Sequence, residues 1–183
     1  GIPLFVHRRC LEPMFAIANR IAYDDKMVSA TVGNLDNTLS SGWINVTEEK
    51  AKGKRYYNKT EAVAAIDTIK YLAQYHHDML SNGVFIITPF TQMKNAVAKE
   101  WQNLAKDTSN HQWMKLAFGK SYADQDMKEF AKTHIGTVHT FQGKEAGVVI
   151  LCLSASAIRG TTGGIKWVNG KPNLLNVAVT RAK

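Results

Sequence analysis

Apolar runs and helical patterns alternate along this chain. Residues 84–87 and 148–153 are continuously apolar, so we expect two strands buried on both faces. Residues 135–138 predict a further strand, and a short apolar run at 4–6 predicts a buried strand near the amino terminus. Strands separated by helices are typical of a parallel sheet covered on both faces. The pattern therefore predicts an α/β fold.

Helical spacing fills the segments between these strands. Pro13 opens a helix over residues 14–22, since proline is tolerated in a first turn. Asn58 or Thr60 can cap a long helix that runs to about residue 80. Its apolar positions recur at three-residue steps and are Val63, Ile66, Ile69 and Leu72. We expect further helices at 91–106 and 173–183, and helical pieces around Trp113 and Met127.

Two segments lack either pattern and predict loops. Residues 31–58 are rich in Gly, Asn, Ser and Lys, with a short strand expected at 43–46. Residues 160–170 hold several glycines and predict a mobile loop. No apolar run approaches the roughly 20 residues of a membrane span, and no signal peptide is recognisable. The chain starts at Gly1 rather than Met, which suggests a piece of a longer protein.

The cysteines and histidines give no metal-ligand spacing. Cys10 and Cys152 lie far apart in the sequence, which favours two reduced core thiols in a cytoplasmic protein. The His76-His77 pair has no partner at zinc spacing, so we expect no metal site.

The net charge of +8 suggests a polyanionic partner, and its distribution is more informative than its size. The 38 residues from 146 to 183 contain no Asp or Glu. They contain five cations, namely Arg159, Lys166, Lys171, Arg181 and Lys183. Such a region suits phosphate, although a solvated basic face is the alternative.

Two polar clusters follow predicted strands. His7-Arg8-Arg9-Cys10 comes first, and guanidinium groups match phosphate oxygens bidentately. A surface arginine pair or a structural salt bridge is the alternative. In Thr88-Pro89-Phe90, a hydroxyl and backbone amides can hold a nucleic-acid phosphate, or the motif can simply end the strand. Because parallel sheets bind ligands beyond the carboxyl ends of their strands, these clusters are candidate sites.

Two longer clusters are more specific. Residues 136–145 (GTVHTFQGKE) leave a strand, and Gly143 permits a tight turn that brings Gln142, Lys144 and Glu145 together. Residues 176–183 (NVAVTRAK) place Val177 and Arg181 on one face of a helix. Taken alone, Arg181 near a helix end can also serve to compensate the helix dipole.

These four clusters resemble, in family order, motifs of superfamily 1 helicases over nearly the whole chain. TVHTFQGKE resembles motif V, NVAVTRAK motif VI and TPF motif IV. The first cluster, with Pro13-Met14-Phe15, resembles the arginine motif that opens the second motor domain. That motif is found in the branch with the RNA-surveillance and DNA-replication 5′-to-3′ helicases. The resemblance implies a second, RecA-like motor domain over residues 1–183, in a protein that binds ATP and Mg²⁺.

The resemblance also implies roles for individual residues. Arg181 matches the arginine finger, and Arg9 matches a phosphate-contacting arginine. The segment from Gln142 through Gly143 and Lys144 to Glu145 matches the nucleotide side. Positions that face a single strand of DNA or RNA are matched by Thr88, Pro89, Thr137, His139 and Thr140. The other expected partner is the first RecA-like domain of the same polypeptide.

Two departures bear on this interpretation. The sequence has no G-x-x-x-x-G-K-[ST] loop and no acidic magnesium pair after a strand, both of which the family carries on its first motor domain. It ends at Lys183, where the family usually adds a strand, so we expect an unpaired sheet edge. The alternative is a non-catalytic nucleic-acid-binding module, which would not need Arg181. A dinucleotide-binding oxidoreductase is disfavoured because no G-x-G-x-x-G follows a strand.

Overall fold

The main sheet contains three parallel strands. The computed structural model describes residues 6–8, 10–30, 41–46, 56–118, 124–154 and 162–182. In this sheet β3 (Val84–Thr88) lies between β4 (Ile135–Thr137) and β5 (Val148–Leu151). Residue 86 pairs with residue 135 on one side and with residue 150 on the other. The three strands predicted from the apolar runs and their parallel pairing are confirmed, but the residues of β5 are half-buried rather than buried on both faces.

Helices pack on one face of this sheet around Trp101. They are α2 (Lys59–Tyr75), α3 (Thr91–Leu104), α4 (His111–Phe118) and α5 (Asp124–Thr133), joined by η1 (His77–Leu80) and η2 (Thr108–Asn110). Trp101 is fully buried, and its ring lies 4.1 Å from that of Phe130 and 6.0 Å from that of Trp113, between centroids. These aromatic contacts hold α3, α4 and α5 together over the sheet.

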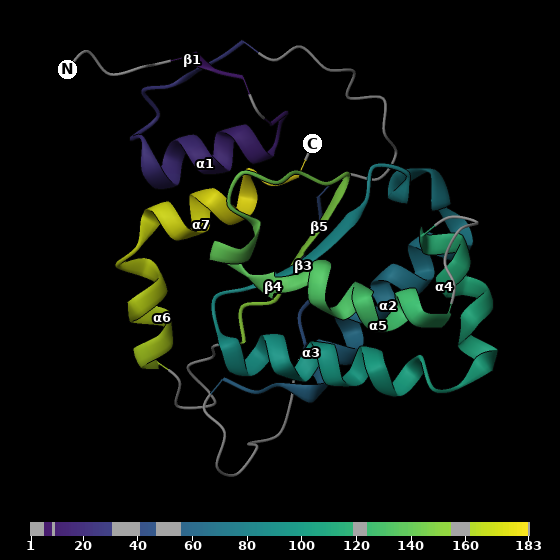
Figure 1. Ribbon diagram of the computed structural model, residues 1–183. Helices are drawn as coiled ribbons and strands as arrows, with labels where there is room; N and C mark the ends of the chain where they lie inside the picture. The colour runs from purple at the N-terminus through teal and green to yellow at the C-terminus, as the bar shows by residue number, and fades with distance from the viewer. Residues whose placement is uncertain are drawn as a thin grey trace.

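The opposite face is covered by α7 (Pro172–Val179) and η3 (Val138–Phe141). Ile87, Phe141 and Leu174 form a second buried cluster there. Figure 1 shows α1 (Met14–Ala22) lying on α7. Helix α6 (Thr162–Asn169), which precedes α7 in the chain, lies between α7 and the near end of α3 (Figure 1). Helices therefore flank both faces of a parallel sheet, which is the predicted RecA-like α/β fold.

The long helix α2 begins as predicted. The side chain of Asn58 accepts a hydrogen bond from the Glu61 amide at 2.9 Å, which is an N-terminal cap. The helix ends at Tyr75 and is followed by η1. Val63, expected in the core, is exposed, whereas Ala62 is buried. Three-residue steps rotate around a helix of 3.6 residues per turn, so one end of such a series leaves the buried face.

Three of the predictions made from the sequence are wrong. Residues 162–169, inside the predicted mobile loop, form α6. Residues 43–46 form no strand, and Trp43 is 79% exposed. Val6 is 53% exposed, because among the described strands β1 (Val6–His7) pairs with β2 (Val28–Ser29) alone, in a two-stranded sheet apart from the main one (Figure 1). Residues 4–5 lie outside the described residues.

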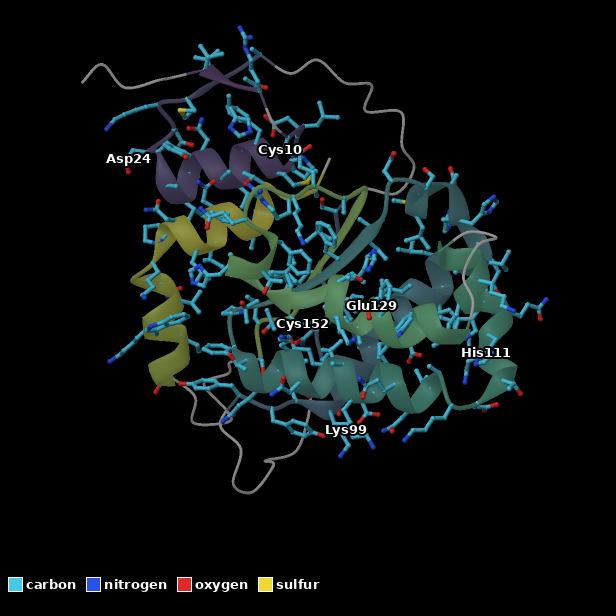
Figure 2. The ribbon with its side chains drawn as sticks, in the orientation of Figure 1. Cys10, Asp24, Lys99, His111, Glu129 and Cys152 are labelled. Atoms are coloured by element: carbon cyan, nitrogen blue, oxygen red, sulfur yellow. The ribbon has the colours of Figure 1, made fainter. Side chains whose placement is uncertain are left out.

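Two further expectations concern single side chains and the membrane. Cys10 and Cys152 are both buried, as predicted, and Figure 2 shows them in different layers of the molecule. Burial raises the pKa of the Cys152 thiol far above its ordinary value. Among the described residues, no helix has the length and apolar character needed to cross a bilayer.

Candidate functional site

The turn after β4 is built by two threonines and a glycine. Thr137 caps η3, its amide donates to Thr140 Oγ1 at 3.2 Å, and the two hydroxyl oxygens lie 3.3 Å apart. A Cβ on Gly136 would lie 2.8 Å from both Phe141 Cε2 and Thr140 Cβ. The turn thus folds back tightly over the strand, which only glycine allows, and it leaves His139 exposed.

The same loop returns to the sheet through Gly143, whose φ of +84° favours glycine. The Lys144 amide donates to the Phe141 carbonyl at 3.0 Å, and the Ala146 amide donates to the Arg181 carbonyl at 3.0 Å. Gln142, Gly143 and Lys144 are exposed and Glu145 is half-buried. The loop is therefore attached directly to the end of α7.

Arg181 lies in the turn that follows α7 and is only 2% exposed. Its Nε donates to the Val177 carbonyl at 2.8 Å, and one terminal nitrogen donates to the Lys144 carbonyl at 3.1 Å. The other terminal nitrogen donates to Thr180 Oγ1 at 3.2 Å. Carbonyls in the last turn of a helix lack intrahelical partners, so Arg181 completes the end of α7 and links it to the loop. The helix predicted to reach residue 183 ends at Val179.

Arg181 nevertheless lines a cavity of about 330 Å³, here called the arginine cavity. The other lining residues are Val6, His7, Arg8, Tyr23, Asn176, Val177 and Thr180. No acidic residue is among them, and Arg8 is exposed. The Asn176 amide nitrogen donates to the Tyr23 hydroxyl at 3.1 Å, while its buried Oδ1 has no partner among the described residues. The cavity thus brings two arginines, Arg8 and Arg181, and Asn176 to one lining.

Arg9, predicted to contact phosphate, lies outside the described residues. Its neighbour Arg8 lines the arginine cavity; the sequence analysis had placed Arg8 in the same cluster proposed to face phosphate but gave it no role of its own.

A second cavity of about 420 Å³, the histidine cavity, lies between η3 and the start of α7. It is lined by Val138, His139, Gln142, Gly170, Lys171, Pro172, Asn173, Leu174 and Val177. The sequence placed His139 and Gln142 on opposite sides of a cleft, but the structure places both on this cavity. Val177 lines both cavities, so they are neighbours along α7.

The residues predicted to face nucleic acid differ in exposure. Thr88 pairs with Thr137 in the sheet, as the strand ends suggested, but it is 0% exposed. Its hydroxyl accepts the Phe90 amide at 3.2 Å, so in this structure it orders the strand exit. Pro89 and Thr137 are half-buried, and His139 and Thr140 are exposed.

Comparison with known proteins agrees with this architecture. A protein-family model described as an AAA domain matches residues 8–183, nearly the whole chain. No curated protein matches the chain significantly.

Proposed function

Because this chain belongs to the AAA domain family and is a helicase-like NTPase domain, we propose that it is the second motor domain of an ATP-dependent superfamily 1 helicase. One observation carries the proposal. Arg8 and Arg181, from opposite ends of the sequence, line one cavity. Guanidinium groups match phosphate oxygens bidentately, so a cavity that brings two arginines together suits a phosphate chain.

In this proposal ATP and Mg²⁺ bind mainly to the first motor domain and face the arginine cavity across the cleft. ATP supplies the γ-phosphoryl group whose transfer to water releases the free energy for movement. Arg8, which is exposed, contacts phosphate oxygens and balances the charge that grows on them during transfer. Arg181 and Asn176 contribute from the cavity wall.

The nucleic-acid side is the exposed end of the loop, at His139 and Thr140, together with the adjoining histidine cavity. Lys171 adds a cation there. Contacts of this kind go to the phosphate backbone of single-stranded DNA or RNA, so binding would depend on salt and little on sequence. The loop that carries His139 and Thr140 is held in position by Thr88, Pro89 and Thr137.

Hydrogen bonds join the two sides. Arg181 donates to the Lys144 carbonyl and accepts from the Ala146 amide, while the other end of the same loop carries His139. Movement of Arg181 toward a nucleotide would pull on the loop that faces the strand. The proposal therefore links ATP occupancy to grip on nucleic acid through residues 137–146.

The alternative, a non-catalytic nucleic-acid-binding module, is favoured by one observation. Arg181 is almost completely buried and bonded to backbone carbonyls, as a purely structural arginine would be. The exposed Arg8 separates the two proposals, because a module without ATP hydrolysis does not need a guanidinium there.

The test is Arg8→Ala in the full-length protein, with Arg20→Ala as matched control. Arg20 is also exposed, lies on α1 and lines neither cavity. Arg8→Ala should lower nucleic-acid-stimulated ATP turnover by about 10²-fold or more, with Arg20→Ala near wild type. A full-length protein that binds single strands but hydrolyses no ATP, or an Arg8→Ala variant with normal turnover, would contradict the motor proposal.

A further inference from the structure

An aromatic cluster lies beside the proposed nucleic-acid side and has no role in the preceding account. Phe90 follows β3 directly, and its ring stacks on that of Tyr56, with centroids 4.0 Å apart and planes 7° apart. The Trp167 ring of α6 lies 5.9 Å from the Phe90 ring. Figure 1 shows α6 beside the amino-terminal end of α3, where Phe90 is located.

The cluster forms because α6 carries a glycine where it meets the two stacked rings. A Cβ on Gly164 would overlap the Tyr56 ring and would lie 3.1 Å from Phe90 Cζ. The glycine thus allows the first turn of α6 to rest on the rings. The last turn then presents Trp167, which is 40% exposed. A large aromatic residue held by rigid neighbours but open to solvent is available to a planar ligand.

Lys171 connects this cluster to the histidine cavity. Its Nζ lies 4.7 Å from the centroid of the Trp167 ring, and the residue also lines the cavity that His139 borders. A continuous surface therefore runs from His139 past Lys171 to Trp167 and Phe90. Its Lys171 and Trp167 belong to the stretch of 38 residues with five cations and no acidic residue, a composition that suits a polyanion.

We propose that the exposed face of Trp167 is a stacking site for a nucleobase of the bound single strand, with Lys171 on the adjacent phosphate. The attraction between an ammonium group and an exposed aromatic ring is weaker than the stacking of a nucleobase on the same ring. An arriving base can therefore displace Lys171 from the ring. The displaced ammonium then pairs with the phosphate of the same strand. This inference rests on the proposed function, because the strand that supplies the base is the one the motor would hold.

Stacking distinguishes this site from the backbone contacts at His139 and Thr140. Every nucleobase has a π-face, so stacking needs a base but does not select its identity. Backbone contacts need only phosphate and sugar. A strand without bases should therefore keep the contacts at the loop and lose the contact at Trp167.

The experiment compares Trp167 variants of the full-length protein on two labelled probes by fluorescence anisotropy. One probe is a single-stranded thymidine oligonucleotide, and the other is an abasic strand of equal length. Trp167→Leu, which keeps apolar bulk, should weaken binding to the thymidine strand by about tenfold and leave binding to the abasic strand unchanged. Trp167→Phe should stay within about threefold of wild type on both strands. Trp43→Ala, which removes an exposed tryptophan outside any helix or strand, is the control.

The outcomes separate this inference from the proposed function. Equal weakening on both probes would mean that Trp167 only supports α6, and unchanged binding on both would mean that no base stacks there. Either result overturns the stacking site and leaves the motor proposal intact. A wild-type protein that binds neither probe overturns both. The double variant Thr137→Ala with His139→Ala should weaken both probes alike, which tests the backbone contacts independently.

Discussion

Replacing Arg181 should lower stability as well as ATP turnover, because the structure gives this side chain a place in the fold. Arg181→Ala removes the three side-chain hydrogen bonds described above, two of them to the backbone carbonyls of Val177 and Lys144. Hydrogen bonds from a charged group contribute about 1.5–3 kcal/mol each. Ordering an arginine side chain costs up to about 2 kcal/mol, which offsets part of this gain. The expected net loss is about 2.5–7 kcal/mol.

The assay is urea unfolding monitored by tryptophan fluorescence, and it is completed before any activity is measured. The ammonium group of Arg181→Lys can restore one hydrogen bond to a carbonyl but not the several bonds of the guanidinium group. The loss in free energy of unfolding should therefore be about half that of Arg181→Ala. Lys144→Ala is the matched control, since the bond to Arg181 uses the backbone carbonyl of Lys144 and not its side chain. It should unfold within about 0.5 kcal/mol of wild type, as an exposed substitution does.

ATP turnover is then measured where each variant is still folded. We expect Arg181→Ala to lose about 10³-fold or more, the usual contribution of an arginine finger. Arg181→Lys should recover little of this turnover, even though it recovers part of the stability. A destabilisation of Arg181→Ala below about 1 kcal/mol would refute the inference that its hydrogen bonds support the fold. Normal turnover in a folded Arg181 variant would assign the residue to structure alone.

Two further predictions concern the loop and its surroundings. Gly136→Ala should destabilise the protein by about 1–3 kcal/mol, because its Cβ would crowd Phe141 and Thr140. Gly163→Ala is the control and should not destabilise the protein, because a Cβ there would meet nothing within 4 Å. Equal urea midpoints for the two variants would contradict the steric role of Gly136. Burial is the main cause, and the Lys144 charge the second, of a pKa of His134 below its ordinary 6.5. Below that pH the unfolded imidazole takes up a proton that the folded one resists. The free energy of unfolding should therefore be highest above pH 6.5 and decrease as the pH falls below it. His134→Gln should flatten this acid-side fall in urea midpoint, with the exposed His77→Gln as control, and an unchanged slope would count against the effect.

Much of the fold follows from local patterns, and the errors have a common physical cause. The apolar runs at 84–87 and 148–153 predicted β3 and β5 because strands buried on both faces need no polar alternation. Residues 162–169 were expected to be a loop because glycine weakens isolated helices. Contact between Gly164 and two rings, which come from residues 56 and 90, reverses that preference. Such long-range packing leaves no local signal in the sequence.

The site shows the same limit at the level of single side chains. In the structure the loop at 137–146 is hydrogen-bonded to Arg181, directly after α7, and the resemblance had assigned both to the nucleotide side. Motif order gave Arg8 no role of its own, although Arg8 lines the arginine cavity. It also did not predict that Arg181 would be buried, because a guanidinium beside a helix end can satisfy carbonyls as well as phosphate. That same versatility lets one residue connect the two proposed sides of the cleft.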